Sequence, residues 1–471
     1  MRKTFCVIVV VAFLSTWTAG RSSGQSGSTN AVHSVPTTSF TGPTLNFDFP
    51  GLEIGVAEYE EGPTGTTVFY FPKGATGVVE VRGGWPGTVN TDGLRLGYED
   101  TSLDAVTFAG GSYYGLEVSG GVADDIRLLR ERTAPPNAVP GRSSSLAPAH
   151  VVAAIVFDLG GRFNTIHPDA DLGRAAFENR RPGWFPLGAH GAGRMTSQGG
   201  PFGERAKSGQ GAAFRQIGPT KLAVFGVMNG GAIVDRNGNV VVENHSSSIV
   251  GPSIADHFKK LLESGGQQAL QANLDQQEPS GFSRSTNLFL VVTNQKMSWA
   301  ELQRLAVQVE TSLARAIQPF NTRGDGDVLY AVSTQEVDNS DLTAEMVNLY
   351  AGEVAWDAVL SSVPPRPVHF TTQVKVDANT LDLYAGDYEF GANAALRIRR
   401  EGDHLVATAT GARAIYGFAP NKDVELQSGS NNLFYQDNRF QDRVQFTGEG
   451  GVITGLVFNP GLQSILAKKI R

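Results

Sequence analysis

Apolar residues along the chain follow two patterns, one typical of strands and one typical of helices. Val151–Leu159 is a continuous apolar run, which indicates a strand covered on both faces. Through Tyr113–Leu129 and Leu342–Leu360 apolar residues instead recur at helical spacing. The first of these segments predicts a buried helix and the second an amphipathic helix.

A third predicted helix follows Leu288–Thr293, which reads as a buried strand. Ser298 and Glu301 form a capping box at the start of this helix, and Pro319 ends it. Its apolar stripe consists of Leu302, Leu305, Val309, Leu313 and Ile317. Further strands are predicted at Val68–Phe71, Gly77–Val81, Ala105–Ala109, Lys221–Met228, Ala232–Asp235 and Tyr330–Val332.

The character of the chain changes at Pro364-Pro365-Arg366-Pro367, which predicts a linker over residues 364–369. Beyond it, short apolar runs are separated by glycine and asparagine turns. The predicted strands are Leu381–Phe390, Leu396–Arg400, Leu405–Thr410, Leu433–Tyr435, Arg443–Thr447 and Val452–Phe458. Residues 370–471 are therefore expected to form a separate all-β module, a small barrel or sandwich.

The first 44 residues resemble neither of these regions. Arg2 and Lys3 precede the apolar run Phe5–Leu14, and small residues follow, which predicts a secretory signal peptide over residues 1–20. A membrane anchor is the alternative, but the run is far shorter than the roughly 20 apolar residues of a spanning helix. Residues 21–44 are rich in Ser, Gly, Thr and Pro, which predicts a disordered lead-in. We expect a secreted or periplasmic protein with no membrane span in its mature form.

Composition narrows the chemistry of the protein. A chain of 471 residues is too long for one ordinary core, so at least two domains are expected. The net charge of −7, without blocks of like charge, argues against nucleic acid as a partner. The single cysteine, Cys6, lies in the predicted signal peptide, which excludes disulfides and thiol chemistry from the mature protein. The sequence has no HExxH, no GxSxG and no phosphate-binding loop, so neither a metal nor an organic cofactor is expected.

Thr286 is the strongest candidate for a nucleophile. It stands in Arg284-Ser285-Thr286-Asn287, directly before the predicted strand Leu288–Thr293. A threonine hydroxyl is a poor nucleophile unless a base lies beside it. A chain cut just before Thr286 would supply that base as its new α-amine, whose ordinary pKa is about 8. The local residues are equally compatible with a solvent-facing position at the head of a strand.

Two acidic residues and one asparagine are candidates for supporting roles. Asp325 and Asp327 are separated by one residue, so both would point to one face of an extended segment. The alternative is an ordinary Gly-Asp turn or a fragment of a calcium loop. Asn229 precedes two glycines, and Asn-Gly is also a strong hairpin signal between the strands predicted on either side.

Several segments, in order, resemble a known family: Asn46–Gly51 with Tyr59–Gly65, Val81–Thr88, Ala109–Leu116, and Ala316–Phe320 through Asp327. The sequence is similar to the DmpA-type N-terminal-nucleophile aminopeptidases and amidohydrolases. It most resembles the branch of nylon-oligomer (6-aminohexanoate) hydrolases. The resemblance runs from about residue 45 to residue 362, and its strength lies in the order and spacing of the segments.

The resemblance implies an α/β fold over residues 45–363, a four-layer αββα sandwich. Members of the family cut themselves into two chains and act on amides. The family's nucleophile falls on Thr286, which predicts self-cleavage between Ser285 and Thr286. The family's oxyanion-side asparagine falls on Asn229. The two aspartates of the nylon-hydrolase branch fall on Asp325 and Asp327.

The sequence departs from the family at three positions. Ser285 stands where the family usually has asparagine. The family's lysine falls on Gly200, and the nearest lysine, Lys207, is either its replacement or a loop charge. A tyrosine near the active site of some members falls on Phe157. Gly110-Gly111-Ser112 either supports the site or forms only a tight turn into a helix, with Ser112 as its N-cap.

We therefore expect a self-processing amide hydrolase that acts on a peptide N-terminus or on an ω-amino-acid oligoamide. The processed units are expected to form a homo-oligomer, and the β-module either to cover the mouth of the active site or to support oligomers. The alternative is a catalytically silent exported scaffold that has kept the fold and binds a polymer, a cell surface or a partner. Glycine at position 200 supports this alternative, whereas Thr286, Asn229, Asp325 and Asp327 argue against it.

Overall fold

The computed structural model describes residues 34–97, 102–199, 206–241, 263, 285–364, 373–413, 415, 417–436, 439–461 and 463–471. Val35–Arg471 forms one compact unit, distinct from Met1–Ser34. The predicted signal peptide and, apart from Pro364, the predicted linker lie outside the described residues. No helix in the described part of the chain is long and apolar enough to cross a membrane.

The α/β part is built on a mixed sheet that has eleven strands within the described ranges, in the order β12-β13-β15-β17-β4-β6-β7-β5, with β3, β1 and β8 joined to it through β4. The long strands are β3 (Glu53–Tyr59), β4 (Thr64–Val81), β6 (Ser102–Ala109), β7 (Val151–Ile155), β12 (Gln210–Ile217), β13 (Thr220–Val227), β15 (Leu288–Gln295) and β17 (Val328–Val337). The short strands are β1 (Pro36–Thr37), β2 (Thr44–Asn46), β5 (Thr88–Val89), β8 (Arg181–Pro182), β9 (Trp184–Pro186), β10 (Ser197–Gln198), β11 (Ala206–Lys207), β14 (Ala232–Ile233) and β16 (Ile317–Gln318).

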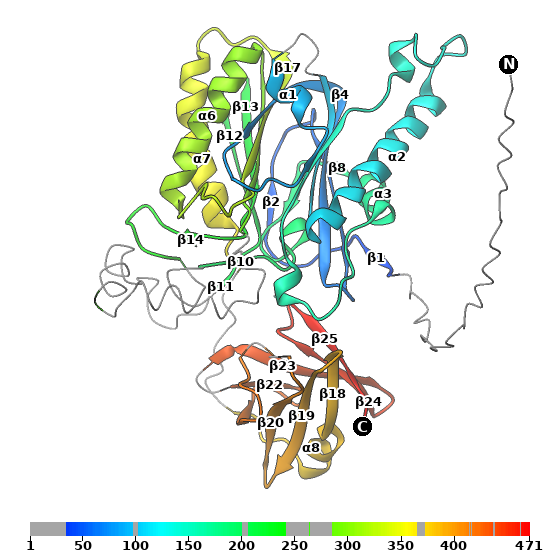
Figure 1. Cartoon of the computed structure of the whole chain (residues 1–471), viewed down its shortest axis with the longest axis vertical. Coiled ribbons are helices and arrows are strands. Elements are labelled where there is room, and N and C mark those ends of the chain that lie inside the picture. Colours follow the sequence, from blue (N-terminus) through cyan, green and yellow to red (C-terminus); the bar gives the residue numbers. More distant parts are fainter. Residues whose placement is uncertain are drawn as a thin grey trace, which may run out of the picture. The chain divides into compact units, whose positions relative to one another are not determined.

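Helices cover this sheet on both sides (Figure 1). They are α1 (Asp92–Leu96), α2 (Val118–Thr133), α3 (Ala170–Glu178), α6 (Trp299–Ala316) and α7 (Ala344–Ser361). Short 3-10 turns occur at η1 (Ser112–Glu117), η2 (Ser144–Leu146), η3 (Leu159–Gly161) and η4 (Gly191–Gly193). The capping box predicted at Ser298 and Glu301 is confirmed at the start of α6.

Strand β4 shows how the layers are organised. Successive side chains of a strand point to opposite faces, so they enter different cores. In the first half of β4, Phe69 packs into a central core and Tyr70 into a core beneath α2 and α3. In the second half, Val79 packs into the same central core and Val78 into a core beneath α6 and α7. The strand therefore belongs to both β-layers, and the four layers form the expected αββα sandwich.

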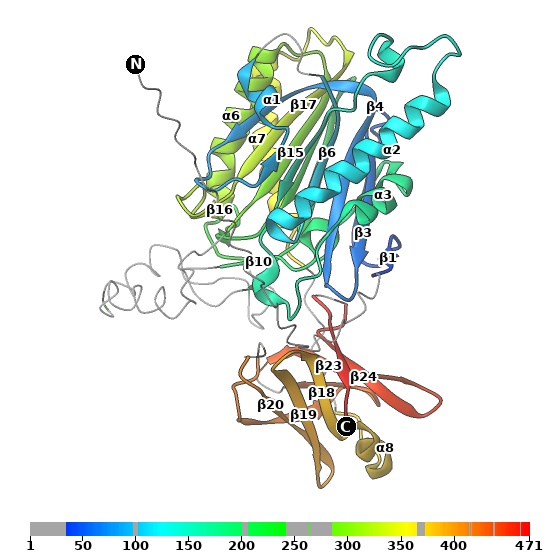
Figure 2. The same ribbon diagram turned by 45° about the vertical axis from the view of Figure 1, so that its right-hand side comes forward.

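Strand β15 positions the residues of interest. It is apolar throughout because Leu290 faces the central core while Val291 faces the core beneath α6 and α7. It pairs in parallel with β17, with Leu288 opposite Val328 (Figure 2). Since both strands begin at the same edge of the sheet, the residues just before them are brought together.

The structure differs from the predicted elements of the α/β part at several places. The strand predicted at Val151–Leu159 ends at Ile155, and Leu159 begins η3. The helix predicted from Tyr113 begins as the 3-10 turn η1, and α2 follows only from Val118. The strands around Asn229 do not form a hairpin, because β13 pairs with β12 and β15 whereas β14 pairs with β16. The two strands predicted at Val68–Phe71 and Gly77–Val81 are one strand, β4, with an irregularity between Tyr70 and Ala75.

The predicted lead-in also contains ordered structure at its end. Pro36 and Thr37 form β1, which pairs with Tyr59 and Glu58 of β3. Thr44 begins β2, which pairs with β9. The prediction of a disordered lead-in over residues 21–44 is therefore wrong at Pro36, Thr37 and Thr44, where pairing with neighbouring strands satisfies backbone groups.

The C-terminal module is a closed β-barrel. The sequence predicted either a small barrel or a sandwich, and the first of these is the form observed. Its strands are β18 (Gly386–Gly391), β19 (Ala394–Glu401), β20 (His404–Thr410), β21 (Asp423–Ser428), β22 (Leu433–Gln436), β23 (Arg439–Glu449), β24 (Val452–Phe458) and β25 (Ile465–Lys469). The strand predicted from Leu381 is wrong at its start, where the chain forms helix α8 (Ala378–Tyr384). Asp377 stabilises this helix as its N-cap, with Oδ1 accepting a 3.0 Å hydrogen bond from the amide of Thr380.

Candidate active site

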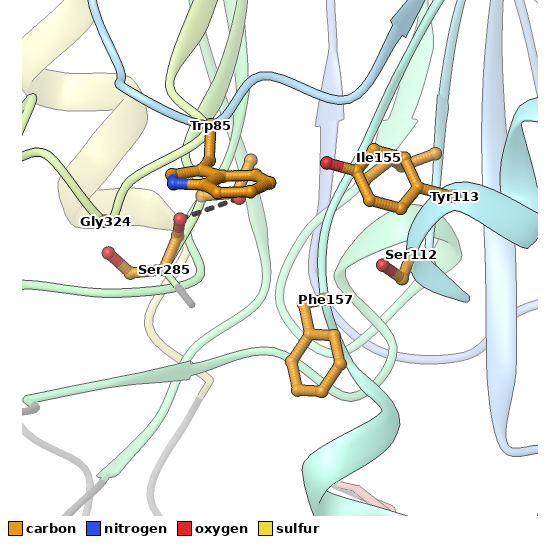
Figure 3. A pocket seen from close by; sticks show the side chains of 8 residues that line it. Trp85, Ser112, Tyr113, Ile155, Phe157, Ser285 and Gly324 are labelled. Atoms are coloured by element: carbon orange, nitrogen blue, oxygen red, sulfur yellow. Dashed lines mark hydrogen bonds between the residues drawn. The ribbon is translucent and has the colours of Figure 1, made fainter. Parts of the chain in front are cut away.

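Thr286 lines a cleft in the α/β part (Figure 3). Its side chain is buried, with 6% of the residue exposed. The cleft has an empty volume of about 440 Å³, part of it open to solvent. Its described lining consists of Trp85, Ser112, Tyr113, Ile155, Phe157, Ser285, Thr286 and Gly324. None of these described lining residues carries a charged side chain, so the walls are mainly apolar and aromatic.

The peptide bond before Thr286 has an unusual hydrogen-bonding environment. Oγ1 of Thr286 donates to the carbonyl oxygen of Ser285 at 2.7 Å, the bond drawn dashed in Figure 3. The backbone N–H of Gly326 donates to the same oxygen at 2.9 Å. Two donors on one carbonyl oxygen withdraw electron density from its carbon before attack, and Gly326 N–H remains to stabilise an oxyanion that forms there. The arrangement is thus suited to attack on the carbonyl carbon of Ser285.

Asn229 holds the nitrogen of Thr286. Its backbone carbonyl accepts a 2.7 Å hydrogen bond from the amide of Thr286. Its side chain links other segments, because Nδ2 donates to the carbonyl of Phe157 at 2.9 Å and Oδ1 accepts from the amide of Ser197 at 3.2 Å. The residue predicted as an oxyanion donor therefore lies at the site, but in the continuous chain its Nδ2 is bonded to Phe157.

Asp325 lies beside the predicted cleavage site. Its carboxylate accepts hydrogen bonds from the hydroxyl of Ser285 and, at 2.6 Å, from the amide of Thr322. Its backbone carbonyl accepts from the amide of Trp85 at 2.8 Å, which fixes one wall of the cleft. Asp325 thus orients the residue on the N-terminal side of the bond rather than Thr286 itself.

Asp327 lies on the other side of Thr286. It is fully buried, and its Oδ1 accepts from the amide of Asn287 at 2.5 Å and from Asn287 Nδ2 at 3.1 Å. Its Oδ2 accepts from the amide of Asn321 at 2.9 Å. Burial, followed by the charge of Asp325, raises the pKa of Asp327 to about 7. The two carboxylates hold the residues on either side of Thr286, and within the described residues neither hydrogen-bonds to Thr286.

Lys207 is connected to the site by strand pairing and one hydrogen bond. It is buried in β11, where it lies opposite Ser197 of β10. Ser197 in turn donates to Asn229. Gly200, on which the family's lysine falls, lies outside the described residues. Whether Lys207 replaces that lysine stays a prediction.

The turn that carries Ser112, on one wall of the cleft, is held by a buried ion pair between Asp158 and Arg162, which the sequence analysis did not predict. Asp158 accepts 2.8 Å hydrogen bonds from Arg162, from the hydroxyl of Thr64 and from the amide of Gly111. A Cβ at Gly110 would lie 2.3 Å from the carboxylate of Asp158, so this turn requires glycine. The spacing of four between Asp158 and Arg162 was the available signal, but such spacing is also common on exposed helices.

No cluster of three or more His, Cys, Asp or Glu side chains able to hold an ion occurs among the residues that the structure describes. The carboxylates of Asp325 and Asp327 are instead occupied by hydroxyl and amide donors.

Comparison with known proteins decides the family. The model of peptidase family S58 matches residues 47–364, which is more than half of the chain. The chain belongs to peptidase family S58. The expected resemblance to amide hydrolases of this type is thereby confirmed, and the protein is an amide-bond hydrolase of this family. The β-barrel lies beyond the matched region.

The relatives that this chain resembles are named either as oligomer endohydrolases or as aminopeptidases. The 6-aminohexanoate-oligomer endohydrolase of Paenarthrobacter ureafaciens is 38% identical over 332 residues, which cover 68% of this chain and 85% of the relative. An uncharacterized aminopeptidase of Mycobacterium leprae is 32% identical over 287 residues, which cover 58% of this chain and 72% of the relative. Among solved structures, a β-aminopeptidase of a Burkholderia species aligns with a TM-score of 0.46 at 16% identity, covering 69% of this chain and 88% of that chain.

Proposed function

We propose that this S58 peptidase cuts its own chain between Ser285 and Thr286 and then hydrolyses amides with Thr286 as its N-terminal nucleophile. The observation that carries the proposal is the pair of hydrogen bonds to the carbonyl oxygen of Ser285, from Thr286 Oγ1 at 2.7 Å and from Gly326 N–H at 2.9 Å. The nucleophile and a backbone donor therefore meet at the bond to be cut.

Self-cleavage proceeds in two steps. Oγ1 of Thr286 attacks the carbonyl carbon of Ser285, the C–N bond breaks, and the released nitrogen takes the hydroxyl proton. The resulting ester joins Ser285 to Oγ1. Water then hydrolyses this ester, which leaves a carboxylate on Ser285 and a free amine and hydroxyl on Thr286. Gly326 N–H stabilises the negative oxygen that forms in each step.

Turnover uses the same atoms. The free amine of Thr286 takes the proton of Oγ1 as that oxygen attacks the carbonyl carbon of a substrate amide, and the proton passes to the leaving amine. Water then releases the acyl group. The carbonyl of Asn229, which accepts from the nitrogen of Thr286 at 2.7 Å in the continuous chain, would hold this amine in place. Departure of Ser285 would free Gly326 N–H for the oxyanion of the substrate.

The proposed substrates are peptides or oligoamides of ω-amino acids. Both classes occur in the names of relatives, as an oligomer endohydrolase and as aminopeptidases. The mainly apolar and aromatic lining of the cleft accommodates a methylene chain or an apolar side chain next to the scissile amide.

Export and assembly belong to the same proposal. Arg2, Lys3 and the apolar run Phe5–Leu14 support cleavage and export of the mature enzyme to the periplasm or the exterior. A homo-oligomer of processed units remains part of the expectation. The alternative of a catalytically silent scaffold is based on glycine in place of the family's lysine at position 200, which lies outside the described residues. Membership of a peptidase family argues against this alternative.

Amide turnover tests the proposal. Purified protein is assayed for release of amines from a linear 6-aminohexanoate oligomer and from a peptide amide. Thr286→Ala should abolish turnover of both probes, whereas Thr311→Ala, at an exposed position on α6, should leave it unchanged. Equal activity of Thr286→Ala and the parent protein would refute the proposed nucleophile.

A further inference from the structure

Ser112 has a backbone conformation that serine rarely adopts. Its φ is 57°, in the left-handed region that favours glycine. The turn that imposes this conformation is rigid, because Gly111 donates to Asp158 at 2.8 Å and Ser112 donates through its amide to the carbonyl of Val156 at 3.0 Å. Side chains kept in strained conformations of this kind cluster at functional sites.

The hydroxyl of Ser112 has no structural task that explains this strain. The alternative in which Ser112 serves as an N-cap is wrong, since Gly111 is the N-cap of η1 and no side-chain cap bond forms. No hydrogen bond from this hydroxyl to any other described residue is found, although 92% of the residue is buried, as 8% is exposed. In contrast, the hydroxyl of Ser119 in α2 donates to the carbonyl of Leu116 at 2.8 Å.

The hydroxyl of Ser112 points into the cleft from the wall opposite Ser285, the residue that precedes Thr286. Figure 3 shows Ser112 and Tyr113 on one side of the cleft, with Ser285 and Trp85 on the other. Apart from Ser285 and Thr286, the other described lining residues are apolar, aromatic or glycine, so Ser112 is a polar group in largely apolar surroundings. A hydroxyl that lines an open cleft can hydrogen-bond to water, and a substrate that displaces this water must supply a partner in its place.

We propose that Ser112 is a substrate-binding residue whose hydroxyl hydrogen-bonds to an uncharged amide group of the substrate and so sets its register against Thr286. This inference rests on the proposed function, because it concerns the same cleft. An amide offers both an N–H donor and a carbonyl acceptor, and a hydroxyl can satisfy either. The apolar walls then hold the methylene or aromatic groups on either side of that amide.

Kinetic constants of the processed enzyme separate this role from the nucleophile's role. Ser112→Ala removes the hydroxyl, and Ser112→Gly removes it while also relieving the left-handed strain. Both variants should raise KM for a linear 6-aminohexanoate oligomer about three- to ten-fold, the range for loss of one neutral hydrogen bond, with a smaller change in kcat. Ser119→Ala is the matched control and should leave KM unchanged.

Calorimetric titration gives a readout that does not depend on turnover. The urea analogue of the linear 6-aminohexanoate dimer, which keeps one carbonyl and its N–H groups but resists hydrolysis, should bind the parent protein about three- to ten-fold more tightly than Ser112→Ala or Ser112→Gly. Equal dissociation constants, or no binding by any of the proteins, would overturn the role of Ser112. If binding differs as expected but Thr286→Ala keeps full turnover, the proposed nucleophile fails and the role of Ser112 stands. A defect in Ser112→Ala that Ser112→Gly repairs would also overturn it, because strain and not the hydroxyl would be the cause.

Discussion

The backbone N–H of Gly326 donates a 2.9 Å hydrogen bond to the carbonyl oxygen of Ser285. The two residues lie 41 positions apart, at the heads of the parallel strands β15 and β17. Because Thr286 Oγ1 reaches the same oxygen, the proposed nucleophile and an oxyanion donor converge on one carbonyl.

Gly326→Ala should block self-cleavage. A Cβ at this position would lie 2.7 Å from Thr286 Oγ1 and 2.7 Å from the carbonyl oxygen of Trp85, so the backbone N–H must move away from Ser285. Loss of one oxyanion donor typically slows a reaction by about 100-fold or more. The fraction of cut chain over time on a denaturing gel measures the effect. Gly120→Ala on α2, where a Cβ meets open space, is the control, and equal cleavage of the two variants would refute this role of Gly326.

Ser285→Ala should slow self-cleavage without blocking it. The hydroxyl of Ser285 donates to the carboxylate of Asp325, which fixes the carbonyl that Thr286 attacks. Hydrogen bonds to a charged partner contribute roughly 1.5–3 kcal/mol, so the rate should fall by about 10- to 100-fold. Time courses of cleavage after synthesis measure this rate, with exposed Ser144→Ala as the control. An unchanged rate would show that Asp325 does not orient Ser285.

Glu310 should make stability depend on pH. Burial raises the pKa of Glu310 on α6 to about 8, well above its ordinary value. Between about pH 5 and 8 the folded protein therefore holds a proton that the unfolded chain releases. Its contribution to the unfolding free energy is complete below that window and falls by about 1.4 kcal/mol per pH unit as pH rises through it.

Glu310→Gln removes this titration and should flatten the pH dependence by that amount. Denaturant unfolding between pH 5.5 and 7.5 measures it, in a Thr286→Ala background that keeps the chain uncut. Asp327, whose pKa is also raised, contributes in the same direction in both proteins, and its charge helps to raise the pKa of Glu310, so the difference reports Glu310 together with this interaction. Parallel pH curves for the two proteins would contradict the buried, protonated state of Glu310.

Asp158→Ala should destabilise the fold strongly. The side chain of Arg162 is 0% exposed and that of Asp158 is 1% exposed, so the variant leaves a buried guanidinium without its counter-ion. Removal of one partner of such a pair costs about 3–5 kcal/mol of unfolding free energy. Denaturant unfolding measures the loss. Asp124→Ala breaks an exposed pair with Arg127 and should change stability little. A loss no larger than that of Asp124→Ala would contradict a structural role for the pair.

Local sequence was sufficient to predict the elements that are buried on both faces or along one helical face. The apolar runs of β7 and β15 and the stripe of α6 were predicted because burial on both faces, or on one helical face, leaves a clear pattern. The pattern failed at Asn229, where β14 pairs with β16 and not with β13. Strand partners depend on contacts between distant segments, which no short window of sequence contains.

The site shows the same limit. Thr286 and the two aspartates could be placed together only through the family resemblance, because the parallel register of β15 and β17 brings them to one edge. Gly326 was missed as a donor because any residue has a backbone N–H, and only the fold directs it at Ser285. Ser112 looked like an N-cap because serine often is one, and its positive φ is invisible in the sequence.

N-terminal sequencing of the purified protein tests self-cleavage at Thr286 most directly. We expect two fragments from the parent chain, the C-terminal one beginning Thr286-Asn287-Leu288. Thr286→Ala should run as a single uncut chain. A parent chain that stays whole, a C-terminal fragment with a different first residue, or cutting of Thr286→Ala at the same bond would contradict Thr286 as the self-released nucleophile.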